Sequence, residues 1–426
     1  MNLTVLIAPS GFKESLLPWQ AAQAMARGVQ QAWPQARVLQ LPLVDGGEGF
    51  AEGLARASGG HVETVEVCGP VGQRLTAHLG WLGPACGPGR TAVVEVAAAA
   101  GLRWVPQDRR NPLHTTSRGV GELISAALDR GAERILLGCG DSGINDGGAG
   151  MAQALGVRLI DADGQDIAPG AAGLLRLDRI DLGGIDPRLQ HVPIHAAVNQ
   201  GNRLLGPRGV ARVHGPQKGA TAAQVEWLEQ ALERWAELLL DSTGIPVDQV
   251  PGAGASGGLG AGLHALLGGV LCPRFDVVFQ HLDLDGLLDR CDLVITGEGQ
   301  LDDQTPNGKV PAEVARRARQ RGLPVLAVAG AIGPGVASTL ACGIDAWLSA
   351  VRRPCEAQEA LDHADRWLAE ATEQALRLVG IGLGLGQRAA GTKKGQSLKT
   401  APDVVVPERG IEPPTFSLRK CAAECK

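Results

Sequence analysis

Short apolar runs that alternate with helical patterns are the feature that most constrains how this chain folds. At the start of the chain, an apolar run at 4–8 is followed by a loop, a helical pattern at 19–33 and a second apolar run at 37–44. The same alternation returns near the other end, with apolar runs at 293–296, 324–330 and 346–351. Such alternation is typical of parallel βαβ units. The two ends of the chain therefore predict one doubly wound sheet.

The middle of the chain has a different pattern. Residues 61–67 and 74–82 alternate polar with apolar side chains, and an apolar segment at 91–100 follows. This pattern predicts an antiparallel or mixed sheet with one face covered. We therefore expect an α/β protein: a Rossmann-like doubly wound domain built from both chain ends, with a second, mixed-sheet α/β domain inserted.

The domain boundaries are expected where these patterns change. The Rossmann-like domain is predicted to comprise residues 1–67 plus 294–383, and the inserted domain residues 68–293. Residues 384–426 have no sustained hydrophobic periodicity and more basic than acidic side chains, so a disordered tail is predicted. A cleft between two such domains is a natural place for a small-molecule site.

Charge and hydropathy exclude several classes of protein. The formal net charge is −5 and no basic stripe is present, which argues against binding nucleic acid. No run of about 18 apolar residues offers a membrane-spanning helix, and the N-terminus lacks a signal-peptide pattern. The nine cysteines are odd in number and scattered, as in a reducing cytosol. We expect a cytoplasmic protein with small-molecule substrates; a homodimer is compatible with this sequence.

Lysine is unevenly distributed along the chain. Five of the eight lysines lie in the last 43 residues, so Lys13, Lys218 and Lys309 are the only ones before residue 384. A compositional bias toward arginine explains the scarcity. Alternatively, these three places require a compact, rotatable ammonium that a planar guanidinium cannot replace.

Two loops near the N-terminus concentrate polar groups where a strand is followed by a helix. The first places Ser10, Lys13 and Ser15 at the mouth of a helix, where free N–H groups and an ammonium suit a phosphate or carboxylate. The second carries Asp45 and Glu48 around a Gly–Gly turn, which suits Mg²⁺ coordination or proton abstraction from an alcohol. Capped helices with solvated side chains remain the alternative for both loops.

A third loop, at 138–148, interleaves Asp141, Asn145 and Asp146 with glycines that include Gly147 and Gly148. Its Gly-x-Gly-x-x-Gly spacing after a strand is similar to a dinucleotide-binding fingerprint. That signal has low specificity, because glycine supplies 60 of the 426 residues. The segment that should form the fingerprint's helix is also interrupted by glycines. An NAD-dependent oxidoreductase of a small hydroxy acid is therefore the alternative function.

A fourth loop places Glu298 and Asp302 before Gly308 and Lys309. It is not a Walker A loop, because Val310 stands where Ser or Thr is required. Its carboxylates still suit a metal ion, and its lysine suits a phosphate.

Two further cations complete the candidate set. Lys218 lies between Gly and Pro residues, so all three lysines fall in Gly/Pro loops beside loops with carboxylates. Phosphoryl transfer requires cations around the moving oxygens, carboxylates for Mg²⁺ and a base for the attacking hydroxyl. Arg118, at the start of a predicted helix, is a candidate for binding a carboxylate. His191 and His195 have no third ligand in sight, so a zinc site is not expected.

Together these loops resemble those of the bacterial glycerate kinases of the two-domain type. The resemblance rests on IAPSGFKESL, DGGEG, TTSRGVGELI, NDGGAGMAQALG, GPQKGA, PGAGASGGLGAGL and VITGEGQLDDQTPNGKVP, in that order over about residues 1–381. It implies a Rossmann-like domain with an inserted α/β domain and a site in the cleft. It also implies transfer of the ATP γ-phosphoryl group to D-glycerate with Mg²⁺, giving 2-phosphoglycerate.

Residue roles follow as hypotheses. Lys13, Asp45, Glu48 and Asp146 are the catalytic candidates, with Asp45 as the base for the glycerate hydroxyl and Glu298 and Asp302 as the Mg²⁺ ligands. The predicted phosphate- and substrate-binding residues are Ser10, Ser15, Arg118, Gly147, Gly148, Lys218 and Lys309.

The sequence departs from the family pattern in places. Ser10-Gly11 replaces an Asp-Ser pair, and Val198-Asn199-Gln200 replaces a Cys-Asp-Val. A related hydroxy acid is therefore an alternative acceptor, and a non-catalytic sensor of small acids is the third class of function considered.

Overall fold

A computed structural model describes residues 3–12, 15–86 and 89–392 of the chain. By its internal contacts the chain divides into two units, Met1–Arg377 and Leu378–Lys426. Both sheets that position the candidate site belong to the first unit.

The first sheet is built from both ends of the chain, as the alternating pattern predicts. Its five strands are all parallel, in the order β15-β13-β11-β1-β2. They are β1 (Thr4–Ile7), β2 (Arg37–Gln40), β11 (Leu293–Thr296), β13 (Val325–Ala329) and β15 (Ala346–Ser349). Strand β1 lies between β2 and β11 and so joins the N-terminal segment to the C-terminal one.

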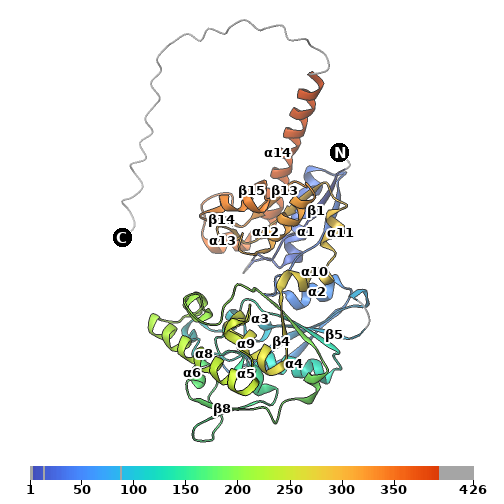
Figure 1. Cartoon of the computed structure of the whole chain (residues 1–426). Helices are drawn as coiled ribbons and strands as arrows, with labels where there is room; N and C mark the ends of the chain where they lie inside the picture. The colour runs from blue at the N-terminus through green and yellow to red at the C-terminus, as the bar shows by residue number, and fades with distance from the viewer. Residues whose placement is uncertain (1–2, 13–14, 87–88, 393–426) are drawn as a thin grey trace, which may run out of the picture. The chain divides into compact units, whose positions relative to one another are not determined.

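Helices cover both faces of this sheet, because its three central strands, β13, β11 and β1, carry buried apolar side chains on both sides. Val5 and Ile7 pack with α1 (Pro18–Ala32) and α14 (Ala364–Thr392), which contributes Trp367. Successive side chains of a strand point to opposite faces. Leu6 accordingly lies in another cluster, with α10 (Arg274–His281), α11 (Leu284–Leu288) and α12 (Val310–Gln320). Figure 1 shows α1 and α12 beside these strands.

The second sheet is mixed, as its alternating segments predict. Its order is β10-β9-β6-β5-β4-β3, antiparallel from β3 to β5 and parallel from β5 to β10. The strands are β3 (His61–Cys68), β4 (Arg74–Trp81), β5 (Thr91–Glu95), β6 (Arg134–Gly138), β9 (Ile194–Val198) and β10 (Val270–Pro273). The chain is therefore an α/β protein in which a mixed-sheet domain is inserted into a doubly wound one.

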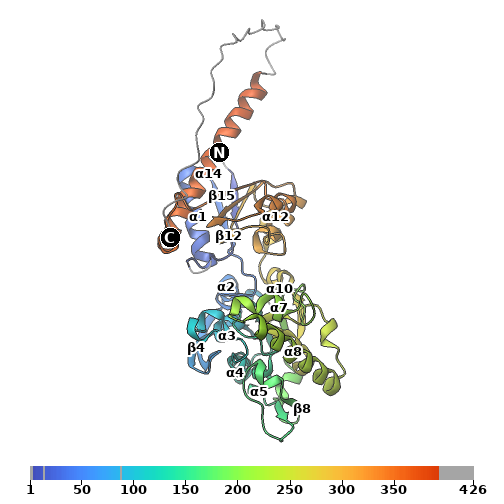
Figure 2. The same cartoon turned by 90° about the vertical axis from the view of Figure 1, so that its left-hand side faces the viewer.

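Helices also cover this second sheet. Val93, Leu136 and Ala197 face α2, and the intervening side chains face the largest buried cluster of the structure. The surrounding helices are α2 (Phe50–Ala57), α3 (Val96–Ala100), α4 (Arg118–Asp129), α5 (Ala149–Ala154), α8 (Ala222–Thr243) and α9 (Ala255–Leu267). Figure 2 shows α3, α4, α5 and α8 gathered in this part of the molecule.

Smaller elements connect these layers. Two-stranded pairs are formed by β12 (Gln300–Leu301) with β14 (Ala331–Ile332) and by β7 (Arg158–Asp161) with β8 (Leu177–Asp181). The remaining helices are α6 (Ala171–Leu174), α7 (Val210–His214) and α13 (Ala357–Asp362).

The structure differs from the sequence prediction at three places. The strand expected over 37–44 ends at Gln40, because residues 41–45 continue as an extended loop. The helical pattern at 356–379 predicts one last helix, but the structure divides it between Asp362 and Ala364 into α13 and α14. Helix α14 continues to Thr392, nine residues past residue 383, so the segment 384–392 is helical where a disordered tail was expected. Residues 393–426 lie outside the described residues, and the exact domain boundaries stay predictions.

Candidate active site

The carboxyl ends of the parallel strands carry most of the predicted site residues. Ser10 follows β1, Asp45 lies in the loop after β2, and Glu298 follows β11. The strands β2, β1 and β11 are neighbours, so these loops leave the same edge of the sheet. The Ser10 backbone N–H donates to the Gly297 carbonyl at 2.8 Å, which ties the first and fourth loops together. This edge is where open α/β sheets bind ligands.

Asp45 and Glu48 are the two candidate bases whose side chains reach solvent, whereas Asp146 is fully buried. The Asp45 side chain is 41% exposed, and its Oδ2 lies 3.3 Å from Nη1 of Arg274. Its Oδ1 accepts a hydrogen bond from the Gly47 N–H at 3.4 Å. Gly46 has φ +90°, a conformation that suits glycine, and a Cβ there would lie 3.2 Å from the Ala197 carbonyl. The Gly–Gly turn thus lets the loop approach the second sheet closely.

Lys309 lies among carboxylates, as the fourth loop predicts. Its Nζ is 3.2 Å from Asp302 Oδ1 and 3.6 Å from Glu298 Oε2. Burial raises the pKa of Glu298 to about 7, although the Lys309 charge and a 2.7 Å hydrogen bond from Thr305 Oγ1 oppose that rise. Burial also acts to raise the pKa of Asp302, but hydrogen bonds from Gln300 and the Gln304 N–H, with the Lys309 charge, hold it below its ordinary value. Glu298 is therefore the carboxylate of this pair that titrates near neutral pH.

The Glu48 carboxylate is neutralised by Arg103, which follows helix α3. The Glu48 backbone N–H donates to Asp141 Oδ2 at 3.1 Å. The next helix, α2, is held by Glu95 at the end of β5, which accepts the Ala51 N–H at 3.1 Å. These contacts fix the 45–49 loop, and the Glu48 carboxylate is paired with Arg103 as Asp45 is paired with Arg274.

Asp146 is fully buried and bonded only to the protein. Its carboxylate accepts hydrogen bonds from Ser117 N–H (2.7 Å), Ser117 Oγ (2.8 Å), Gly148 N–H (3.2 Å) and Gly150 N–H (3.2 Å). Burial raises its pKa against these four bonds. It joins the start of α4 to the start of α5. The direct catalytic role stays a prediction, and the contacts indicate that Asp146 positions the loop.

Gly147 and Gly148 shape the same loop through their backbone. Their φ angles are +66° and +83°. A Cβ on Gly147 would lie 2.5 Å from Trp235 Cδ1, and the Trp235 indole donates to the Gly147 carbonyl at 2.9 Å. Trp235 of α8 therefore requires glycine here, independently of any ligand.

Lys218 is buried, with 3% of its surface exposed. Its ammonium donates to the Ile144 carbonyl (2.6 Å), Asn145 Oδ1 (2.8 Å) and Ser142 Oγ (3.3 Å). Burial lowers its pKa to about 7, against the attraction of Asp146. All three ammonium donors thus have protein partners. Direct phosphate binding by Lys218 stays a prediction that this arrangement does not favour.

The remaining predicted residues have local partners or lie outside the described residues. Lys13 is among the residues that the structure does not describe. Ser15 Oγ donates to the Phe12 carbonyl at 3.1 Å. Arg118 pairs with Glu122 on its own helix at 3.1 Å and is half exposed. Neither contact brings these side chains to Asp45 or Lys309.

The sequence analysis missed two charged residues that hold the candidate site. Glu95 was read only as part of an apolar segment, and Arg274 lies in no glycine-rich motif. Arg274 had a signal, because it is a charged side chain directly after an apolar run, whereas Glu95 lies inside an apolar run and only the structure shows that β5 ends there.

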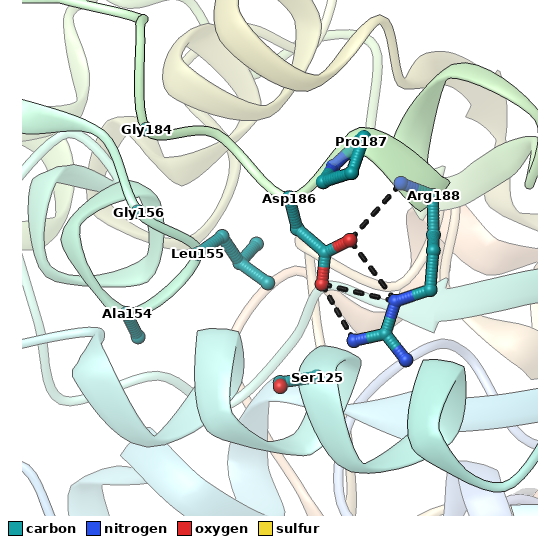
Figure 3. Close-up of a pocket in the computed structure, with 8 residues that line it drawn as sticks. All are labelled: Ser125, Ala154, Leu155, Gly156, Gly184, Asp186, Pro187 and Arg188. Carbon is teal, nitrogen blue, oxygen red and sulfur yellow. Dashed lines mark hydrogen bonds and ion pairs between the residues drawn. The ribbon is translucent and has the colours of Figure 1, made fainter.

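Other features do not add to the site. Among the described residues, no cluster of three His, Cys, Asp or Glu could hold a metal ion by itself. A hollow of about 510 Å³ opens among Ala154, Gly184 and the Asp186–Arg188 ion pair (Figure 3), away from every predicted site residue. In the described part of the chain, no helix is long and apolar enough to cross a membrane.

Comparison with known proteins identifies the family. The sequence model described as "Glycerate kinase family" matches residues 5–380. The chain belongs to the glycerate kinase family. All four loops of the candidate site, including the Asp45 and Lys309 loops, lie inside that match.

Individual members of the family agree with this assignment. The glycerate kinase of Bacillus subtilis is 44% identical over 366 residues, covering 86% of this chain and 95% of that protein. The glycerate 2-kinase of Escherichia coli is 41% identical over 389 residues, covering 91% and 100%. A crystal structure of a protein assigned as glycerate kinase 2 from Salmonella typhimurium LT2 has a TM-score of 0.75 and 43% identity, covering 91% and 100%.

The family membership decides between the classes of function left open by the sequence. Its members are phosphotransferases, so the chain is an enzyme whose phosphoryl donor is ATP. The reading of the third loop as a dinucleotide fingerprint of an NAD-dependent oxidoreductase gains no support from these comparisons.

Proposed function

We propose that the chain transfers the γ-phosphoryl group of ATP to the 2-hydroxyl of D-glycerate, giving 2-phosphoglycerate and ADP. The observation that carries the proposal is the family match over residues 5–380, which contains every loop of the candidate site. The arrangement of Asp45, Lys309 and Glu298 at one sheet edge supports it, because phosphoryl transfer needs a base and charges placed around the phosphates.

Asp45 is the proposed base for the glycerate hydroxyl. Its carboxylate is exposed on one side and paired with Arg274 on the other. Glu48 is engaged by Arg103, and Asp146 is buried under four donors. In the proposed step, the hydroxyl oxygen attacks the γ-phosphorus, its proton passes to Asp45, and the bond to the ADP oxygen breaks.

Lys309 is the proposed phosphate-binding cation. Its side chain is 31% exposed and its ammonium lies between Glu298 and Asp302, so it is able to turn toward an incoming phosphate. Lys13 is proposed as a second phosphate contact from its motif alone. Lys218 is proposed to act at a distance, by holding Ser142 and Asn145 in place.

Mg²⁺ is proposed to bind with the nucleotide. Magnesium sites of this kind usually take one or two carboxylates, with phosphates and water completing the shell. Glu298 and Asp302 fit that need, because both carboxylates lie within 3.6 Å of one cation, Lys309. Bound Mg²⁺ would neutralise charge on the phosphate oxygens. Because the Glu298 pKa is about 7, its ionised, metal-binding form predominates above that pH.

The test is an ADP-release assay with ATP and D-glycerate, with and without Mg²⁺, followed by NMR assignment of the phosphorylated carbon. We expect Mg²⁺-dependent ADP release and 2-phosphoglycerate, with an Mg²⁺ requirement that rises as the pH falls below about 7. A panel of related hydroxy acids tests the acceptor. Glycerate binding without ADP formation would contradict the proposal.

We also propose that the protein is cytoplasmic and that it forms a homodimer. Light scattering, which measures the molar mass in solution, tests the homodimer.

A further inference from the structure

Arg274 joins two loops of the candidate site that are far apart in sequence. Its Nη1 lies 3.3 Å from Asp45 Oδ2, and its Nη2 donates to the Gly308 carbonyl. Gly308 precedes Lys309 and has φ +89°. One guanidinium therefore contacts the loop of the proposed base and the turn that carries the proposed phosphate-binding lysine.

The position of Arg274 in the fold is rigid. It is the first residue of α10, directly after β10, the edge strand of the second sheet. Its guanidinium lies 5.1 Å from the ring centroid of Phe275, which stacks on Phe279 at 5.6 Å. Arg317 of α12 lies 4.4 Å above the Phe279 ring. This row of stacked groups runs along α10 and anchors it to the helix that begins at Val310.

Guanidinium chemistry suits this double contact. Its planar fork directs donors to two acceptors at once, which a single ammonium on a flexible stem does not do. The side chain is 17% exposed, so its contact with Asp45 is only partly screened by water. Loss of the fork would free the Asp45 carboxylate and the Gly308–Lys309 turn together.

We infer that Arg274 is a positioning residue for the reaction: it sets the Asp45 carboxylate and the Lys309 turn at a fixed separation. The inference rests on the proposed function, in which Asp45 takes the hydroxyl proton and Lys309 meets the phosphate. Misplacement of reacting groups by about 1 Å costs on the order of 100-fold in rate. A positioning role therefore has a kinetic signature.

The test compares Arg274→Met with Arg274→Lys in the full chain, with Arg290→Met as the matched control. Arg290 is 57% exposed, and its contacts among the described residues are with Asp283 and Gly286, close to it in the sequence. We expect Arg274→Met to lower kcat about 10- to 100-fold and to raise the KM for ATP, with the KM for D-glycerate unchanged. Arg274→Lys should restore either the kcat or the KM for ATP, but not both. Arg290→Met should have the kcat and KM values of the wild type.

Double mutants identify the route by which Arg274 acts. If it acts through Asp45, the kcat of Arg274→Met combined with Asp45→Asn equals that of Asp45→Asn alone. If it acts through the turn that carries Lys309, the KM for ATP of Arg274→Met combined with Lys309→Met equals that of Lys309→Met alone. Losses that simply multiply, or wild-type kinetics for Arg274→Met, would overturn the inference.

Two controls keep the result interpretable. If Arg274→Met fails to fold, Arg274→Lys is measured instead: a reduced kcat or a raised KM for ATP at the wild-type melting temperature supports the inference, and wild-type values of both overturn it. Wild-type turnover of ATP with D-glycerate is measured first, because its absence would refute the proposed function rather than the role of Arg274.

Discussion

Two regions of the molecule contain the same residue types in different surroundings. The buried cluster comprises Ser117, Ser142, Asn145, Asp146 and Lys218. The charged cluster comprises Asp45, Arg274, Glu298, Asp302 and Lys309: Arg274 pairs with Asp45 and contacts the Gly308 carbonyl, and Lys309 pairs with Glu298 and Asp302. In the first, an aspartate and a lysine are closed off by protein donors and acceptors; in the second, they face partly into solvent.

The difference shows that burial, and not residue type, separates a structural group from one available to a substrate. Both lysines lie in Gly-rich loops of family motifs, so the sequence treats them alike. Lys218 has three neutral oxygen partners, whereas Lys309 is 31% exposed among carboxylates. A charge is kept inside a protein only when partners satisfy it, and those partners then hold it in place.

The largest expected effect distinguishes the two aspartates. We expect Asp45→Asn to lower kcat by about 100- to 10,000-fold, because an amide cannot take the hydroxyl proton, while the melting temperature is unchanged. Asp146→Asn should instead lower the free energy of unfolding by about 2 kcal/mol or more, because its amide meets the Ser117 and Gly150 N–H donors.

Steady-state kinetics and urea unfolding measured on both variants provide the check. Asp303→Asn, next to a predicted metal ligand but in an exposed position, is the control and should retain wild-type values. An Asp146→Asn protein that is as stable as the wild type but inactive would contradict the structural role of Asp146. It would instead indicate that Asp146 takes part directly in the reaction.

The lysines provide the second contrast. Lys309→Met is expected to lower kcat/KM for ATP about 100-fold with no loss of stability, since its side chain is partly exposed. Lys218→Met should lower the free energy of unfolding by about 1–3 kcal/mol, because the Ile144 carbonyl and Asn145 Oδ1 lose a buried donor. Thermal melts and ATP titrations separate the two outcomes. If Lys309→Met and Lys218→Met lowered the free energy of unfolding equally, the contrast between a structural and a substrate-facing lysine would be wrong.

A third prediction concerns pH and extends the comparison to Glu95. Burial raises the Glu95 pKa from about 4.5 to about 7, opposed by hydrogen bonds from the Ala51 and Gly49 N–H groups. The folded state therefore holds a proton that the unfolded state has released between those pH values. Stability from this group is present below about pH 4.5 and is lost as the pH rises through about 7.

Glu95→Gln removes that titration. Relative to wild type, the variant should gain stability from pH 5 to pH 8, by an amount on the order of 3 kcal/mol at most. Glu237→Gln on the surface, 66% exposed, serves as the control with no such trend. Parallel pH dependences for Glu95→Gln and wild type would contradict the role of burial.

The smallest effect is expected at the end of the chain. The family match ends at residue 380, and α14 ends at Thr392. A chain stopped after Thr392 should keep full activity and the same melting temperature as the complete chain, because the site residues precede Arg377. A large loss of activity in the ADP-release assay would show that residues 393–426 contribute to the enzyme.

Much of the fold could be predicted because its signals are local. The apolar runs at 4–8 and 293–296 became adjacent parallel strands, and the alternating segments at 61–67 and 74–82 became the antiparallel edge of the second sheet. The helix end at Thr392 could not be predicted, since the glycines at 380, 382, 384 and 386 favour a loop by propensity.

The candidate site was predicted in outline only. Glycine-rich motifs located Asp45, Glu298 and Lys309, because strand ends in parallel sheets supply ligand contacts. Arg274 and Glu95 were missed, since each acts on a loop more than 40 residues away in the sequence. Such pairs have no signature in a single sequence.

The α/β class, the family and the loops that carry the charged groups could all be inferred from the amino-acid sequence. These depend on periodicity and on motifs, which are properties of neighbouring residues. Which of those charges is buried and which is exposed follows from the packing of the folded chain. Lys218 and Asp146 are enclosed by segments from elsewhere in the chain, whereas Lys309 and Asp45 are not. Burial depends on long-range packing, and it fixes whether a charge is available to meet a substrate.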